Sequence, residues 1–202
     1  PMTVLRDWDF ATKKTSIAMT LAHFYGQQLL SGTQRERGTS EMELIESLAR
    51  DLPAAAQLDA LNEVVNRLED DFGTWRTPWG EVNRFQRLSG DIDLAYDDDE
   101  PSIAIGMGNS RWGALADFGA SRRDGTKKLY GSNGNSFVAV VEFGDRLQAK
   151  TILVGGQTNA PDSPHFSDQA PLYADHQFKA VAFYRDDIEE RAVERYAPGE
   201  RQ

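Results

Sequence analysis

The stretch that decides the fold class is NSFVAVVEFGDRLQAKTILVGGQTNAPDSPHFSDQ, residues 135–169. Its opening segment, 136–143, alternates along the chain, and both alternating sets of side chains are largely apolar. Because successive side chains of a strand point to opposite faces, this pattern predicts a strand covered on both sides, inside a layered structure. Gly144 and Asp145 permit a tight reversal, and residues 147–154 are again β-branched and apolar toward their end. The two segments are therefore predicted to form an antiparallel hairpin.

Glu142 is the one charged residue of the first strand of this hairpin. By alternation it shares a face with Val138 and Val140. A buried carboxylate must be hydrogen-bonded or paired with a cation, since an unpaired one costs several kcal/mol. Two interpretations stay open from the pattern alone: a functional carboxylate beneath a site, or an edge-strand carboxylate that points to water.

Composition limits the classes of function. A chain of 202 residues with 40% hydrophobic residues can build a core and is expected to fold compactly. The 32 acidic against 22 basic residues give a net charge of -10, which disfavours a nucleic-acid partner. No uncharged apolar run approaches the roughly 20 residues that span a bilayer, and no basic-then-apolar leader is found, so no membrane partner is expected. The absence of cysteine excludes disulfides and thiolate zinc sites without indicating a compartment.

The first third, residues 1–73, is predicted to be helical after an irregular lead-in over 1–10. Apolar spacing predicts a helix from Thr15 or Ser16 to Gly32, and a charged linker over 33–38 follows. Ser40 and Glu43 form a capping box that opens a second helix, which runs to Arg50. A third helix restarts at Pro53 and ends at Gly73.

Residues 74–202 are predicted to be mainly β, with short helices near the C-terminus. Glycine and proline punctuate this part, and its apolar runs are too short for helices. The expected extended segments are 82–85, 103–107, 113–118, 129–130 and 179–183, in addition to the hairpin. The expected helices are a short one from Ser167 or Asp168 to His176 and a charged one over 186–196, which Pro198-Gly199 ends.

Several local clusters resemble sites but favour plainer interpretations. The acidic segment 91–100 lacks the alternating oxygen ligands and central glycine of a calcium loop, so a solvated loop without metal is favoured. The segment 131–135, GSNGN, lacks the lysine and following helix of a phosphate-binding loop and is predicted to be a turn before a strand. Asp7 and Asp9 are two residues apart and are expected at the surface.

The histidines and the first residue were also considered as chemical groups. His23, His165 and His176 lie too far apart in the sequence to show metal-ligand spacing. His23 falls on a predicted helix, where a packed or capped histidine is expected, so only His165, in a loop, is placed near a possible site. Pro1 could act as a secondary amine, as in tautomerases, but the β-α-β pattern that would follow is absent.

Four stretches together resemble the C-terminal part of the β chain of the penicillin acylase family, within the N-terminal nucleophile hydrolases. They are LRDWD at 5–9, TPWGEVNRFQR at 77–87, GNSFVAVVEFG at 134–144 and SPHFSDQ at 163–169. Each is weak alone, but their order and spacing are specific and cover nearly the whole chain. The likeness is closest to the branch that contains acyl-homoserine lactone, cephalosporin and aculeacin acylases.

The resemblance implies an α+β fold that forms part of a four-layer α/β/β/α sandwich, and amide hydrolysis by an N-terminal serine freed by self-cleavage of a precursor. That serine, its histidine and the oxyanion-hole residues lie upstream of the region that this chain resembles, and Pro1 is no nucleophile. Residues 1–202 are therefore expected to be a single C-terminal segment of an acylase β chain, either excised or further processed. Of the family's site residues, only a glutamate that supports the catalytic histidine falls here, and Glu142 is the candidate.

The resulting hypothesis is part of an acylase that cleaves an acyl group from an amine such as an acyl-homoserine lactone, a β-lactam or a lipopeptide. Its expected partners are the α chain and the serine-bearing β segment of the same precursor, together with a small acylated amide as substrate. No cofactor and no metal are implied, and the resemblance implies a periplasmic or secreted location. The alternative is a non-catalytic β-sandwich module that binds a ligand or a partner chain.

Overall fold

The computed structural model describes residues 1–34, 37–197 and 199, which fall into two compact units. Unit 1 comprises Pro1–Leu88 and Ile92–Gly134, and unit 2 comprises Ser89–Asp91 and Asn135–Gln202. Each unit combines helices with its own sheet, so the predicted α+β class is confirmed. None of the described helices has the length and apolar character needed to cross a bilayer.

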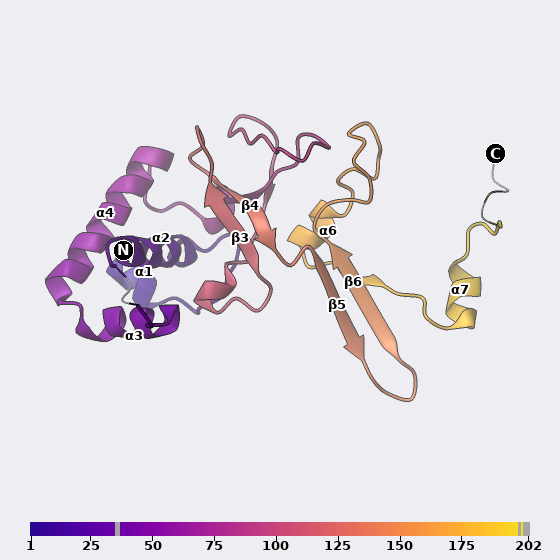
Figure 1. Cartoon of the computed structure of the whole chain (residues 1–202), viewed down its shortest axis with the longest axis horizontal. Helices are drawn as coiled ribbons and strands as arrows, with labels where there is room; N and C mark the ends of the chain where they lie inside the picture. The colour runs from indigo at the N-terminus through magenta and orange to yellow at the C-terminus, as the bar shows by residue number, and fades with distance from the viewer. Residues whose placement is uncertain (35–36, 198, 200–202) are drawn as a thin grey trace. The chain divides into compact units, whose positions relative to one another are not determined.

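Unit 1 begins with four helices, three of which confirm the predicted ones (Figure 1). They are α1 (Met2–Arg6), α2 (Ile17–Ser31), α3 (Glu41–Asp51) and α4 (Ala54–Phe72). The Ser16 hydroxyl accepts a hydrogen bond from the Met19 amide at the start of α2, and Ser40 and Glu43 complete the capping box of α3. Gly73 ends α4 with a φ of 76°, in the left-handed region that favours glycine. Part of the predicted linker over 33–38 lies outside the described residues.

The lead-in predicted to be irregular instead contains α1. Val4 and Leu5 of this helix and Trp8 after it are partly buried against the core of unit 1. That tertiary packing stabilises a helix too short to form alone. The core itself lies mainly between α2 and α4, which cross side by side, and it extends to the segment after α4. Its fully buried large residues include Leu21, Phe24, Val64, Leu68, Trp79 and Val82.

The sheet of unit 1 has four strands in the order β2-β1-β4-β3. The strands are β1 (Asn83–Phe85), β2 (Ile103–Ala104), β3 (Phe118–Arg122) and β4 (Leu129–Gly134), preceded by the one-turn helix α5 (Trp79–Val82). β1 runs parallel to β4, while the other two pairings are antiparallel.

Two local predictions in this sheet are wrong. Residues 113–118 form no strand: a 3-10 turn, η1 (Ser110–Trp112), ends at Gly113 with a φ of 83°, and β3 begins only at Phe118. Residues 131–134 of the predicted turn are instead the end of β4, paired with β3. A Cβ on Gly131 would run into the Phe118 ring, so the glycine serves close packing across the strands rather than a reversal.

Side chains in the stretch 77–87 hold later segments of unit 1 in place through hydrogen bonds. The buried Asn83 amide donates to the carbonyls of Ile105 and Met107 at 2.9 and 2.8 Å, and the Trp79 indole donates to the Met107 carbonyl at 3.3 Å. Gln86 donates from its side chain to three carbonyls of the segment 97–101. These bonds satisfy backbone groups that would otherwise be buried without partners, which explains why polar side chains occupy this interior.

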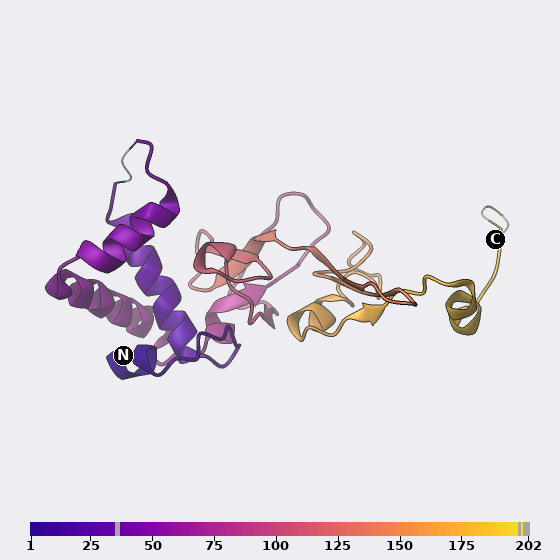
Figure 2. The ribbon, with the colours of Figure 1, turned by 90° about the horizontal axis from the view of Figure 1, so that it is seen from below.

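Unit 2 is built around the predicted hairpin, which is confirmed. β5 (Phe137–Glu142) pairs antiparallel with β6 (Gln148–Leu153), from Phe137 opposite Leu153 to Glu142 opposite Gln148, and β7 (Lys179–Ala180) adds to the other edge of β6. The helix α6 (Ala170–Ala174) lies against β6 (Figure 2). A second helix, α7 (Arg185–Arg191), is shorter than the predicted 186–196 because no residue of it is buried, so no packing extends it.

The expectation that β5 is covered on both faces is wrong for the chain by itself. Five of the six strand residues are exposed, and only Val138 is partly buried. The side chain of Phe137 is 56% exposed and that of Phe143, just after the strand, is 84% exposed. Apolar alternation shows that both faces suit a covered position, but none of the described elements of unit 2 covers them.

Candidate functional site

Glu142 is the last residue of β5, opposite Gln148 on β6. It is exposed, so the burial expected from its apolar neighbours is not found within this chain. Among the described residues no hydrogen bond or ion pair engages its carboxylate. The nearest cation along the chain, Arg146, is occupied elsewhere: it contacts Asp186 and Asp187 at 2.8 and 2.9 Å. The Glu142 carboxylate is thus available to a group outside the described part of the chain.

Exposed apolar side chains accompany Glu142 on the same small sheet. We call this set the hairpin surface: Phe137, Val140, Val141 and Phe143 of the β5 segment and Val181 and Phe183 after β7. All six side chains are at least 40% exposed. Large exposed apolar groupings on a soluble domain mark places where another protein surface packs.

The stretch 163–169 ends the long loop after β6 and is hydrogen-bonded to the beginning of the same loop. Backbone amides of Gln157 and Gln169 donate to the carbonyls of His165 and Gly155, both at 2.9 Å. Phe166 and Gln169 point inward and are buried. A Cβ on Gly156 would collide with the carbonyls of His165 and Phe166, which accounts for a glycine at this close approach.

His165, the histidine predicted to be nearest a site, projects outward from this loop. Its side chain is 68% exposed, and its Nδ1 lies 3.0 Å from Oδ2 of Asp168. The hydrogen bond from His165 is the main cause that lowers the pKa of the Asp168 carboxyl. The structure brings these two side chains together but does not pair either one with Glu142.

His23 of α2 is a buried titratable group of unit 1. It is only 5% exposed, with its ring 4.8 Å from that of Trp79 and 5.5 Å from that of Phe24. Neither ring nitrogen has a hydrogen-bond partner among the residues that the structure describes. Burial lowers the pKa of His23 to about 4, and the positive charges of Arg67 and Arg111 lower it further in the same direction. An unsatisfied buried polar group costs about 1–3 kcal/mol, so the ring position calls for an explanation.

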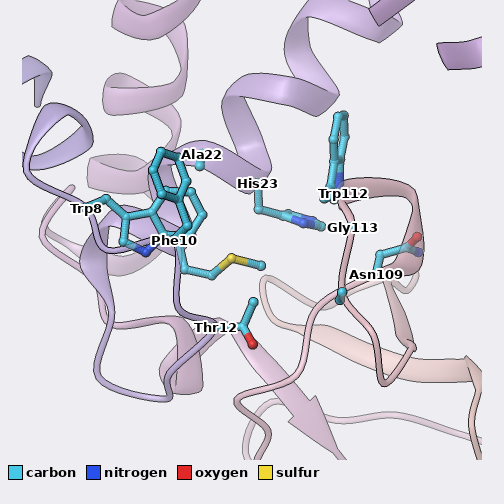
Figure 3. A pocket seen from close by; sticks show the side chains of 10 residues that line it. Trp8, Phe10, Thr12, Ala22, His23, Asn109, Trp112 and Gly113 are labelled. Carbon is cyan, nitrogen blue, oxygen red and sulfur yellow. The ribbon is translucent and has the colours of Figure 1, made fainter.

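The His23 ring faces a cavity of about 270 Å³ between α2 and the η1 segment (Figure 3). The walls are mostly apolar, and the polar side chains besides His23 are those of Thr12 and Asn109. The lining residues are Trp8, Phe10, Thr12, Met19, Ala22, His23, Asn109, Trp112, Gly113 and Ala114. The sequence placed His23 correctly as a packed helix residue but gave no signal of the cavity, whose walls come from three separate segments.

A second cavity of about 400 Å³ adjoins the first. It shares Trp8, Phe10, Ala22 and Trp112 with the first cavity, and it continues along apolar side chains of α2 and α3. Gly26 allows the Trp112 ring to lie against α2, because a Cβ there would stand 2.7 Å from the ring.

The remaining candidates have structural roles or simple surface positions. Within the acidic segment 91–100, Asp98 accepts hydrogen bonds from the Lys127 amide and the Tyr130 hydroxyl, so it anchors the start of β4. Asp9 pairs with Lys13 at 2.6 Å at the surface. Pro1 precedes the first turn of α1. In the described ranges, no group of three or more histidine, aspartate or glutamate side chains could hold a metal ion.

The family model described as penicillin amidase matches residues 2–190, which is nearly the whole chain. No curated protein matches the chain.

Proposed function

Because the chain belongs to the penicillin amidase family, which is a family of hydrolases, we propose that it forms part of an acylase that cleaves an acyl group from an amine. The substrates we propose are amides such as an acyl-homoserine lactone, a β-lactam or a lipopeptide. In this proposal the chain is a C-terminal segment of the β chain, and the nucleophilic serine lies on another segment. The observation that supports it best is the family match, which spans both units.

The hairpin surface supports the proposal that other parts of the same precursor pack here. Burying one large apolar side chain gains about 1.5–3 kcal/mol, and six such side chains are exposed together on this sheet. Both faces of β5 have the apolar pattern of a strand in the middle of a layered sandwich. The proposed partners are the α chain and the β segment that bears the N-terminal serine.

The chemistry proposed for the assembled enzyme is serine acyl transfer. The serine hydroxyl attacks the amide carbonyl, and its own α-amino group takes the proton. The tetrahedral intermediate collapses to an acyl-serine ester as that proton passes to the departing amine, and water then hydrolyses the ester. Glu142 would accept a hydrogen bond from the histidine near the serine and hold that ring in one orientation, which makes it a positioning residue. Two observations support this role: the carboxylate is exposed and no described residue engages it, and it lies at the end of a strand whose apolar faces are exposed.

The test is Glu142→Gln in the complete precursor, which keeps the size of the side chain and removes its charge. We expect correct processing and a turnover lower by about ten- to hundredfold, the range of residues that orient a catalytic group. Glu190→Gln, an exposed glutamate of α7, is the matched control and should leave turnover unchanged. Unchanged turnover in correctly processed Glu142→Gln would remove Glu142 from the site.

The assembly itself is tested by the mass of the native material. Intact-mass analysis should show a second polypeptide that begins with serine, and cell fractionation should place the complex in the periplasm or outside the cell. The chain alone should be inactive, since the nucleophile and oxyanion donors are supplied by the partner segments. Turnover by the pure chain, or native material without a serine-initiated polypeptide, would contradict the proposal.

A further inference from the structure

The outer edge of β5 has no part in the proposed acyl transfer. β5 is the first strand in the sheet order β5-β6-β7, so it has a neighbouring strand on one side (Figure 1). The Val154 amide donates to the Ser136 carbonyl at 2.9 Å, which shows that the even-numbered residues of β5 bond to β6. The odd-numbered residues, Phe137, Ala139 and Val141, therefore direct their backbone N–H and C=O groups to the outer edge. Among the described residues, no hydrogen bond engages these groups.

The other edge strands of the two sheets are protected against pairing, whereas β5 is not. β2 and β7 are each two residues long, and β7 carries Lys179. β3 has an irregular register between Gly119 and Ala120 and ends in Arg122. Short length, irregular register and charge are devices that keep an edge strand from pairing with another chain. β5 pairs with β6 over six residues without a break, and its segment 137–141 contains no charge and no proline.

The sequence of β5 is nearly symmetric about Ala139, so the strand is complementary to a second copy of itself. In an antiparallel pair with Ala139 opposite Ala139, Val138 lies opposite Val140, and Phe137 lies opposite Val141. Apolar side chains thus meet apolar side chains on both faces. The same register brings the outward backbone groups of one copy opposite those of the other, which is the condition for hydrogen bonding between them.

This register also keeps charges away from the two-fold axis. Glu142 lies opposite Ser136, so six residues of strand, about 20 Å, separate the carboxylates of the two copies. Like charges that lie directly opposite each other would destabilise the pair, and this arrangement avoids them. The pairing uses only the edge of β5. Both faces of the strand therefore stay free for the precursor segments that are proposed to pack there.

We propose that the free chain forms a symmetric dimer in which two β5 edges pair antiparallel about Ala139. The second copy supplies the hydrogen-bond partners that the outward backbone groups of β5 lack within the described chain. The strands of the joined sheet then follow the order β7-β6-β5-β5-β6-β7. Because β7, at each outer edge, is short and carries Lys179, the association ends at two chains.

Sedimentation velocity of the pure chain tests the association. We expect an equilibrium between monomer and dimer with a Kd of about 10–100 µM, in the weak range of a small interface, and no larger species. A chain that stays monomeric up to about 1 mM would overturn the dimer. Oligomers larger than two chains would overturn the closed pairing.

The register is tested by cysteine substitutions, since the chain has no cysteine of its own. In the proposed dimer Ala139→Cys meets its counterpart across the axis with Cα atoms about 5.5 Å apart, a distance that a disulfide spans. Val141→Cys, on the same face and edge, is the matched control because it lies about 14 Å from its counterpart. Mild oxidation should link the first variant and not the second. Absence of the Ala139→Cys link, or equal linking of both variants, would contradict the register.

Exchange of charge at the axis tests the pairing without a disulfide. Ala139→Lys and Ala139→Asp each place like charges opposite each other in a dimer, so each should weaken the association about two- to fivefold. An equal mixture of the two variants should recover it, because opposite charges then meet at the axis. A mixture that associates no better than either variant alone would refute the pairing at Ala139. These measurements need no acylase activity, so their failure is distinct from failure of the proposed function.

Discussion

Acid should destabilise unit 1 through His23. The pKa of this ring is about 4 in the folded chain, against an ordinary value of 6.5. Between these values the unfolded chain binds a proton that the folded chain excludes, so the free energy of unfolding falls as the pH falls from about 6.5 to about 4. At about 1.4 kcal/mol per pH unit, the contribution amounts to about 3 kcal/mol. That is a large share of the typical total of about 5–15 kcal/mol for a domain.

The assay is urea unfolding followed by tryptophan emission, which reports unit 1 alone because all four tryptophans lie there. From pH 7 to about pH 4.5 the wild-type protein should lose about 2–3 kcal/mol more than His23→Leu, which cannot titrate. Carboxylates whose pKa values are lowered, such as Asp9, also lose stability as the pH falls, but they do so equally in both proteins.

His165→Leu is the control, since its exposed ring should leave the pH profile of unit 1 unchanged. Parallel profiles for the wild type and His23→Leu would refute the reasoning. They would show that the ring is hydrated, or that it is hydrogen-bonded in a way the structure does not contain.

Three further substitutions test the packing. Asn83→Leu should lower the free energy of unfolding of unit 1 by about 2–4 kcal/mol in the same urea assay, because two buried carbonyls lose their donor. Gly26→Ala should displace the Trp112 ring and cost about 1–3 kcal/mol; an unshifted emission maximum would contradict the close contact. Phe143→Ser should change the stability of the isolated chain by no more than about 0.5 kcal/mol, yet weaken its co-elution with the rest of the precursor, as size-exclusion chromatography would show.

The helices of unit 1 could be predicted because their limits are encoded locally. Ser16, the pair Ser40 and Glu43, and Gly73 each act within one turn of a helix end, so the sequence alone contains the whole signal. The hairpin could also be predicted from the sequence, since its alternating strands and its turn lie within twenty residues. Of the four N-terminal helices, α1 was not predicted, because it depends on packing against residues far along the chain.

The errors have a different physical origin. Glycine at 131 suits a turn and a close strand contact equally well, and only the position of the Phe118 ring decides between them. Alternation showed that β5 can be covered on both faces but not which polypeptide covers it. The His23 cavity could not be foreseen, because its walls combine residues 8–23 with residues 109–114, which lie almost ninety positions later in the sequence.

Several residues in the stretches that carry the family resemblance have structural roles within this chain. Trp8 donates to the Ala11 carbonyl and packs on the core, and Asn83 joins β1 to the segment after β2. Phe166 is buried inside its own loop. Each of these residues performs its work with partners that the chain supplies. Glu142 differs from these three residues, because no described residue engages its charge and the apolar faces of its strand are exposed. The role proposed for Glu142 therefore depends on the polypeptide that packs onto β5. The kinetics of Glu142→Gln in the complete enzyme will decide whether Glu142 has that role.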